Sequence, residues 1–220
     1  MPEFFKLFSL GKLGTPYAQT IISDNDVFFT DCPECERNRF NEDNEDLSLI
    51  IIQGKRKLPD YLLCGHWPIK IVSQRVIDAW QKHGVTGYTS FPIQKLLDKK
   101  MEQVHHDVQY HVVKVTGRVE LDFEKMGVRI VEQCDTCGVV RYDKDLWCWK
   151  FKFFKDYTYD GSDLFAAKHF EYTPYCTKKI LEITHREKFT NFGFRLQTPT
   201  ATLSNPSPDI DLKELFRKKK

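Results

Sequence analysis

The sequence predicts an α+β fold made of two similar strand-rich halves, each containing a helix followed by a strand. Two observations support this prediction. Several segments alternate apolar and polar residues as half-buried strands do, and two stretches carry the capping residues and apolar spacing of short helices. Similar sequence features also recur at an offset near 103 residues (163 − 60), which indicates an internal repeat.

Bulk composition is that of an ordinary folded protein. Hydrophobic residues make up 41% of the 220 residues and charged residues 29%, so the chain can bury a full core. The net charge of +2, from 33 basic and 31 acidic residues, is too balanced to demand a nucleic-acid or anionic-membrane partner. Residues 1–15 lack the features of a signal peptide, and no apolar run is long enough for a membrane span. We therefore expect a cytoplasmic protein without membrane contact.

The repeat is seen in matching cysteine pairs and in matching downstream segments. The CxxC pairs are offset by 102 residues (134 − 32), and Asp60-Tyr61-Leu62 before His66-Trp67 matches Asp163-Leu164-Phe165 before His169-Phe170. We expect a single domain over residues 1–197, with repeats at about 30–95 and 132–197, followed by a loose tail over 198–220 that begins rich in Thr, Ser and Pro. The alternative to a repeat is that these matches are coincidental, because the identities are few.

Each half has a helix with a recognisable start. Ser73 and Thr177 are placed to cap two helices through their side chains. The inward faces are formed by Val76, Ile77 and Trp80 in the first helix and by Ile180, Leu181 and Thr184 in the second. Strands are expected to follow over residues 88–94 and 192–196.

Further strands are expected between the two helices. Residues 110–115 and 118–123 flank Thr116-Gly117, which is typical of a hairpin turn. A strand over 128–131 leads into the second cysteine pair. Residues 146–154 alternate Trp147, Trp149, Phe151 and Phe153 on one face, which predicts another strand.

Four cysteines form the main candidate site, namely Cys32, Cys35, Cys134 and Cys137. Each CxxC turn presents two sulfurs on one side, and two such turns complete the tetrahedral shell that structural zinc prefers. The 98 residues between them (36–133) add about 1.4 kcal/mol of loop-closure cost relative to a compact zinc ribbon. Because structural zinc contributes on the order of 10–16 kcal/mol, this spacing does not forbid the site.

A zinc-ribbon-like site shared by both halves is therefore predicted. The alternatives are two separate redox or disulfide pairs and unrelated core cysteines. A closed four-cysteine site leaves no open coordination position, so the zinc would be structural rather than catalytic.

The remaining cysteines and the histidines are expected to have structural roles rather than catalytic ones. Cys64, Cys148 and Cys176 are expected to be buried small hydrophobes. His105, His106 and His111 are expected to be surface residues, and His66 and His169 to pack or support rather than catalyse. No phosphate loop, nucleophile elbow or HExxH motif is present. We therefore expect no enzymatic activity.

The order of these motifs resembles a bacterial family. Cys32-Pro33-Glu34-Cys35, then Cys134-Asp135-Thr136-Cys137-Gly138, and the closing segment from Asp163-Leu164-Phe165 to Phe194-Arg195-Leu196 resemble the double-CxxCG motif proteins, although Glu36 stands where the first motif would have glycine. That family is associated with immunity proteins of polymorphic toxin systems. The resemblance implies a cytoplasmic protein that binds and neutralises a cognate toxin.

Two further classes of function are alternatives. A zinc-ribbon nucleic-acid-binding protein is the alternative, but the near-neutral charge and the lack of a basic stripe with interleaved aromatics make nucleic acid an unlikely partner. A metal-dependent hydrolase would need an open coordination site.

The acidic segment Glu34–Asp46 is expected to be an exposed loop, and it would suit contact with a basic toxin.

Overall fold

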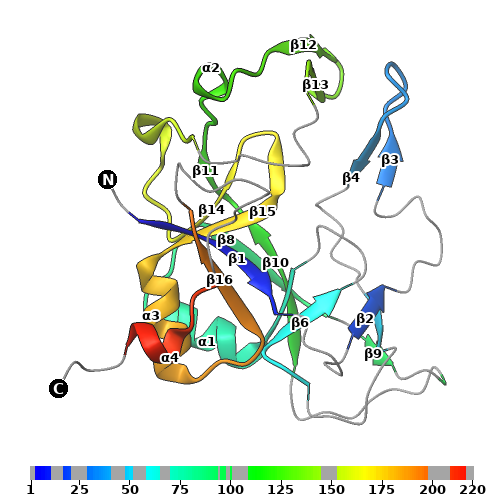
Figure 1. Ribbon diagram of the computed structural model, residues 1–220. Helices are drawn as coiled ribbons and strands as arrows, with labels where there is room; N and C mark the ends of the chain where they lie inside the picture. The colour runs from blue at the N-terminus through cyan, green and yellow to red at the C-terminus, as the bar shows by residue number, and fades with distance from the viewer. Residues whose placement is uncertain are drawn as a thin grey trace.

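Strands make up most of the described structure, and short helices accompany them (Figure 1). The computed structural model describes residues 3–10, 17–20, 29–40, 48–51, 58–64, 70–93, 95–97, 100, 109–144, 153–197 and 209–216. The predicted α+β class is confirmed, because strand-rich sheets and a few helices build this part of the chain.

The first sheet contains the C-terminal strands and the N-terminal one. Its five strands have the order β11-β14-β15-β1-β16. Their bounds are Phe4–Ser9 (β1), Gly117–Val119 (β11), Leu164–Ala167 (β14), Phe170–Thr177 (β15) and Phe192–Leu196 (β16). Neighbouring strands are antiparallel except for β11 and β14, which are parallel. The first strand of the chain thus lies between two of its last strands.

The second sheet has seven strands in the order β8-β10-β7-β6-β2-β5-β9. Their bounds are Tyr17–Thr20 (β2), Ser48–Ile51 (β5), Tyr61–Cys64 (β6), Lys70–Ser73 (β7), Tyr88–Pro92 (β8), Lys95–Leu97 (β9) and Tyr110–Val115 (β10). Strands β6, β7, β10 and β8 are antiparallel neighbours. Here a strand from the middle of the chain lies between β7 and β8.

Two small ribbons and four helices complete the described elements. One ribbon pairs β3 (Phe29–Asp31) with β4 (Asn38–Phe40), and the other pairs β12 (Ile130–Gln133) with β13 (Val140–Tyr142). The helices are α1 (Gln74–Lys82), α2 (Phe123–Met126), α3 (Lys178–Glu187) and α4 (Leu212–Leu215), and a 3-10 turn, η2, spans Asp156–Thr158. Helices α1, α3 and α4 lie together at one side of the molecule, whereas both ribbons lie at the opposite end (Figure 1).

The core joins the two sheets. Its main cluster combines buried side chains of β1, β6, β7, β10, β14, β15 and β16 with the inner faces of α1 and α3. Trp80, Leu164, Ile180 and Phe194 are each at most 1% exposed. A second cluster of aromatic rings packs edge to face around Phe4 and Phe165. Neither cluster contains a cysteine of the CxxC pairs, so the four sulfurs lie outside both clusters.

The two helix starts differ from the predicted caps. Ser73 and Thr177 precede α1 and α3 as expected, but neither side chain bonds to a helix amide. The Ser73 hydroxyl donates instead to Oδ1 of Asp60 at 2.9 Å, and the Thr177 hydroxyl donates to Oδ1 of Asp163 at 3.1 Å. A hydrogen bond to an ionised carboxylate is stronger than one between two neutral groups. The half-buried aspartates therefore hold these hydroxyls in place of the helix amides.

Each aspartate also contacts the other half of the chain. Oδ2 of Asp60 accepts from the backbone amide of Thr190 at 2.8 Å, and Oδ2 of Asp163 accepts from that of Thr86 at 3.1 Å. Each threonine follows the helix of the half to which the aspartate does not belong. The two carboxylates therefore connect the halves as well as the helix starts.

Two expectations about connections are wrong. Residues 110–115 form β10, but Gly117 begins β11, which pairs in parallel with β14 rather than back onto β10. The expected strand 118–123 ends early because Phe123 begins α2. Of the expected strand 146–154, Phe154 forms an isolated bridge with Leu121, and residues 146–152 lie outside the described part.

Part of the expected loose tail is packed. Within residues 209–216, Arg195 binds Asp209 at 2.7 Å, and the amide of Ile210 donates to the carbonyl of Phe194 at 2.8 Å. Ile210, Leu212 and Phe216 pack against the main core. The apolar side chains of this segment explain why it attaches, whereas residues 198–208 and 217–220 lie outside the described part. None of the described helices is long and apolar enough to cross a bilayer.

Candidate metal centre

The first cysteine pair lies in the turn that joins β3 to β4. The amide of Glu36 donates to the carbonyl of Cys32 at 2.9 Å, and the amide of Cys32 donates to the carbonyl of Arg37 at 3.0 Å. Glu36 has a φ of 55°, the left-handed conformation that glycine adopts most readily. Glu36 therefore adopts a conformation that is uncommon for a residue with a side chain, and this conformation closes the turn.

The second pair is built in the same way between β12 and β13. The amide of Gly138 donates to the carbonyl of Cys134 at 2.8 Å, and the amide of Cys134 donates to the carbonyl of Val139 at 3.0 Å. Gly138 has a φ of 70°. Both turns thus bend so that the two sulfurs of each pair lie on one side of the ribbon tip. The ribbons with their turns, residues 29–40 and 130–142, are called the knuckles below.

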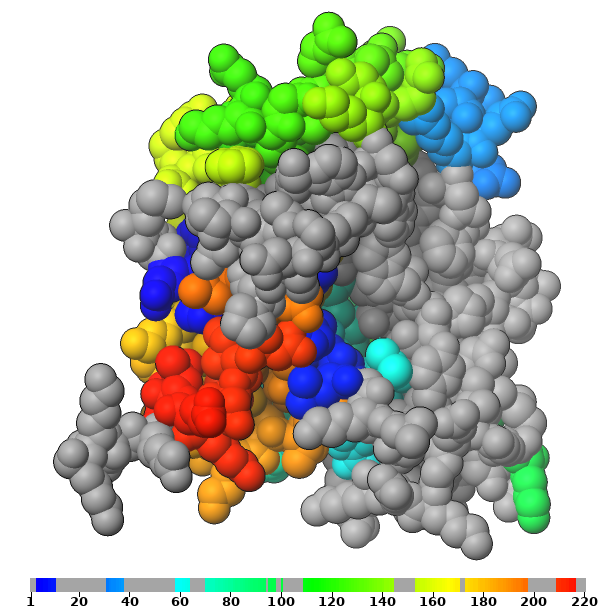
Figure 2. Space-filling model, viewed as in Figure 1, coloured from blue at the N-terminus to red at the C-terminus, as the bar shows by residue number. Residues whose placement is uncertain are grey.

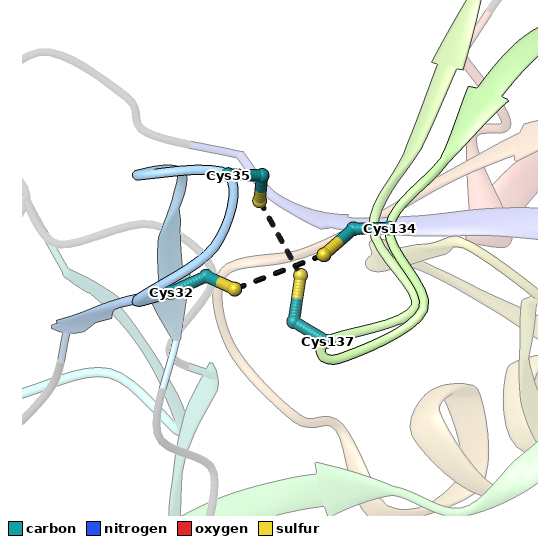
Figure 3. A group of neighbouring side chains, drawn as sticks. All are labelled: Cys32, Cys35, Cys134 and Cys137. Atoms are coloured by element: carbon teal, nitrogen blue, oxygen red, sulfur yellow. Dashed lines mark hydrogen bonds between the residues drawn. The ribbon is translucent and has the colours of Figure 1, made fainter.

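The knuckles bring all four sulfurs together (Figure 3). The Sγ atoms of Cys32 and Cys134 are 3.8 Å apart, and those of Cys35 and Cys137 are 3.6 Å apart. All four sulfurs lie within 4.8 Å of one another. A tetrahedron with metal–sulfur bonds of about 2.3 Å has sulfur–sulfur edges of about 3.8 Å, so the arrangement fits a four-sulfur metal shell.

Backbone amides prepare the sulfurs for a cation. The amides of Cys35 and Glu34 bond to the sulfur of Cys32 and lower the pKa of that thiol to about 7. At Cys35, Cys134 and Cys137 the backbone amides also favour the thiolate, but desolvation by burial and neighbouring sulfurs raise the net pKa of each thiol. Four close thiols resist joint deprotonation unless a cation compensates their charge, which is what a metal ion supplies.

Side chains around the sulfurs link one knuckle to the other. Glu34 accepts hydrogen bonds from the hydroxyl of Thr136 and from the Cys134 thiol. Glu132 forms an ion pair with Arg37 at 3.6 Å and one with Arg141 at 2.9 Å. The space-filling view shows the knuckles in contact at one end of the molecule (Figure 2). Sequence reasoning missed Glu34 and Thr136 as partners, because their pairing depends on the convergence of the two turns.

The remaining candidates lie elsewhere. Cys176 is fully buried in the core, as predicted, whereas the surroundings of Cys64 and Cys148 lie outside the described part. His111 is 8% exposed and contacts the side chain of Gln74, so it is not the surface residue that we expected. Its ring is buried because β10 lies between β7 and β8 and because the ring contacts the first residue of α1.

Of the other candidate histidines, only His169 lies among the described residues. His169 adopts a φ of 68° in the turn between β14 and β15. His66, His105 and His106 lie outside the described residues. Among the described residues, the four cysteines are the one group of three or more His, Cys, Asp or Glu side chains whose ligand atoms gather closely enough to hold a metal ion.

Comparisons with known proteins add no further identification. No protein-family model matches the chain, and no curated protein matches it. The chemistry of the site therefore carries the functional argument: four cysteines that could bind a metal ion in a closed shell, between two segments 102 residues apart.

Proposed function

We propose that the four cysteines bind one zinc ion in a structural role. The sulfur spacing and the all-sulfur ligand set support zinc, which favours four-coordinate thiolate sites. A shell of four protein ligands leaves no position for water or substrate, so the metal ties the knuckles together and performs no reaction.

The same proposal assigns the chain as a cytoplasmic immunity protein that binds and neutralises a cognate bacterial toxin. The observation that carries it is the convergence of Cys32, Cys35, Cys134 and Cys137, because the double-CxxCG resemblance depends on both motifs serving one site. Such a protein acts by occlusion: a stiff body buries a few central side chains against the toxin and blocks its active site. It needs no catalytic residue of its own.

A scaffold of two repeated halves is part of the proposal. The contacts of Asp60 with Ser73 and Thr190 correspond to those of Asp163 with Thr177 and Thr86. The cationic partners also correspond, because Arg75 binds Asp60 at 2.8 Å and Lys179 binds Asp163 at 2.8 Å. These matched contacts support a repeat. They correspond to an offset of 104 residues in the helices (177 − 73 and 179 − 75), one more than the offset of 103 in the sequence alignment.

Capture from the native host tests the function directly. The tagged full chain is used as bait beside Cys35→Ser/Cys137→Ser, with Cys176→Ala as a matched control outside the site. We expect one zinc per chain in the wild type and the control, loss of zinc in the double variant, and capture of a protein with a toxin-delivery region encoded beside this gene. Capture of nucleic acid, or a partner without toxin activity, would refute the immunity assignment, and metal-free wild-type protein would refute the zinc assignment.

A further inference from the structure

The strand that precedes each proposed repeat lies in the sheet of the other repeat. Strand β1 precedes the first knuckle but pairs with β15 and β16, which follow the second knuckle. Strand β10 precedes the second knuckle but pairs with β7 and β8, which follow the first. The strand orders β6-β7-β10-β8 and β14-β15-β1-β16 therefore correspond. The third strand of each order, β10 or β1, is called the central strand below, and the two central strands are interchanged between the sheets.

The register of β1 against β15 corresponds to the register of β10 against β7. Strands β15 and β7 are the ones that lead into the helices α3 and α1. Phe4 is opposite Thr177 in β15, and Tyr110 is opposite Ser73 in β7. The offset is 106 residues along the central strands (110 − 4) and 104 residues along their partners (177 − 73). Phe4 and Tyr110 thus face the residue that precedes a helix in each sheet.

The register also agrees on the other side. Phe5 is opposite Leu196 in β16, and His111 is opposite Pro92 in β8, which again gives offsets of 106 (111 − 5) and 104 (196 − 92). Every further pair in these ladders, down to Ser9 with Phe192 and Val115 with Tyr88, keeps both offsets. A slip of one residue on either side would turn every side chain of the central strand to the opposite face.

Hydrogen bonds beyond the ends of the strands repeat as well. The amide of Gln197 donates to the carbonyl of Phe4 at 2.9 Å, as the amide of Ile93 does to that of Tyr110 at 2.8 Å. The amide of Leu10 donates to the carbonyl of Asn191 at 3.1 Å, as the amide of Thr116 does to that of Gly87 at 2.9 Å. Gly87 and Asn191 both have positive φ values, 85° and 66°.

We propose that this chain is a fused, strand-exchanged pair of repeat units. The first unit comprises β1, the first knuckle, β6, β7, α1 and β8, and the second comprises β10, the second knuckle, β14, β15, α3 and β16. Each unit leaves an open slot between two strands of its sheet. The segment that fills the slot is the first strand of the other unit, β1 in one case and β10 in the other. This inference rests on the proposed repeat and goes beyond it, because a repeat alone does not require exchange.

The side chains of the exchanged strands match the slots in the same way. Phe4 and Tyr110, Phe5 and His111, and Leu7 and Val113 are buried at corresponding positions, whereas Lys6 and Val112 are half-buried. An empty slot would expose the amides and carbonyls of two strand edges together with this apolar surface. Neither unit is therefore a complete sheet without the other. The contact between the knuckles adds a second connection between the units.

Hydrogen exchange of the full chain tests which half depends on which strand. Leu7→Ala and Val113→Ala are matched variants, because both side chains are 5% exposed and occupy corresponding positions. We expect Leu7→Ala to speed amide exchange at least tenfold in β15 and β16 while β7 and β8 change less than twofold. Val113→Ala should produce the opposite pattern.

Milder variants keep the test decisive if either alanine variant fails to fold. Leu7→Val, with Val113→Thr as its counterpart, removes less apolar volume and should show the same opposite patterns. Faster exchange in the sheet of the same unit, or an equal increase in both sheets for both pairs, would overturn the exchange. The measurement involves neither toxin nor metal affinity, so its failure would leave the immunity and zinc assignments to their own tests.

Discussion

At the scale of single residues, Asp60 and Asp163 each connect the start of a helix to a segment of the other half of the chain. Asp60 is 12% exposed at its side chain and accepts hydrogen bonds from Ser73, Arg75 and Thr190. Burial by itself raises the pKa of this carboxyl, but the hydrogen bonds outweigh it and hold the pKa below its usual value. The residue is thus kept ionised at the junction of the two halves, where its charge is fully paired.

Replacing this carboxylate should destabilise the protein. Asp60→Asn leaves Arg75 without its counter-charge and removes an acceptor for Thr190, so we expect a loss of about 1–3 kcal/mol in urea unfolding at neutral pH. Asp163→Asn should lose a comparable amount through Lys179 and Thr86. Asp209→Asn is the control, because its ion pair with Arg195 is half exposed and should contribute less than about 1 kcal/mol.

The pH dependence gives a second readout for Asp60. A lowered pKa in the folded state stabilises the protein above the unfolded value of about 3.9. The difference in stability between wild type and Asp60→Asn should therefore be constant from neutral pH to about that value and should shrink as the pH falls further. A difference that does not change between pH 7 and pH 3 would contradict the role of the charge.

At the scale of elements, the clearest departure from expectation is the connection at Thr116-Gly117. These residues suggested a hairpin, yet β10 continues the seven-stranded sheet while β11 joins the five-stranded one. The amide of Gly117 donates to the carbonyl of Gly87 at 3.2 Å, and a Cβ at Gly117 would lie 2.2 Å from the carbonyl oxygen of Leu164. The glycine is needed because three segments cross closely at this point, not because a hairpin turns there.

A methyl group at this crossing should therefore be costly. Gly117→Ala would force apart backbone segments that have no free movement, so we expect a loss of about 1–3 kcal/mol, measured by urea unfolding. Gly193→Ala is the matched control. Its Cβ would lie 2.5 Å from the ring of Phe8, a half-buried side chain that can rotate away, so its loss should be smaller. A larger loss at Gly193 would refute this account of the crossing.

At the scale of the whole molecule, the core and the knuckles join distant parts of the chain in different ways. Inside, the sheets share one hydrophobic cluster with α1 and α3. At the edge, the knuckles meet through sulfurs that are absent from the core clusters. Because the two core clusters do not include the site, a metal ion bound here would order two ribbon tips, whereas in isolated zinc fingers the metal drives the whole folding reaction.

Removing the metal should therefore loosen the knuckles without unfolding the chain. We expect a chelator at neutral pH to leave the far-ultraviolet circular dichroism nearly unchanged and to speed hydrogen exchange only within residues 29–40 and 130–142. If zinc is present at about a thousand times its Kd, its loss removes about 4 kcal/mol of stabilisation and lowers Tm by on the order of 10 °C. Cys35→Ser should show the lower Tm without chelator and no further change with it. Complete loss of structure on chelation would contradict a self-sufficient core.

Much of the site could be predicted from local sequence. The CxxC spacing by itself presents two sulfurs per turn, and the requirement for four ligands places Cys32, Cys35, Cys134 and Cys137 in one predicted site. The helices were predicted at Ser73 and Thr177 because their apolar positions repeat with helical spacing. These signals act over a few residues, so the sequence displays them directly.

The tertiary structure decided every feature whose partner is distant. Ser73 and Thr177 bind aspartates rather than helix amides, Gly117 meets Leu164, and β1 inserts between strands near the opposite end of the chain. Residues 209–216 likewise attach because α3 and β16 offer an apolar surface for Ile210 and Phe216. Alternation of apolar residues defines which side of a strand is buried. The same alternation suits any neighbouring strand that also has a buried face, so it does not specify the neighbour. The choice among neighbours depends on how the whole chain packs.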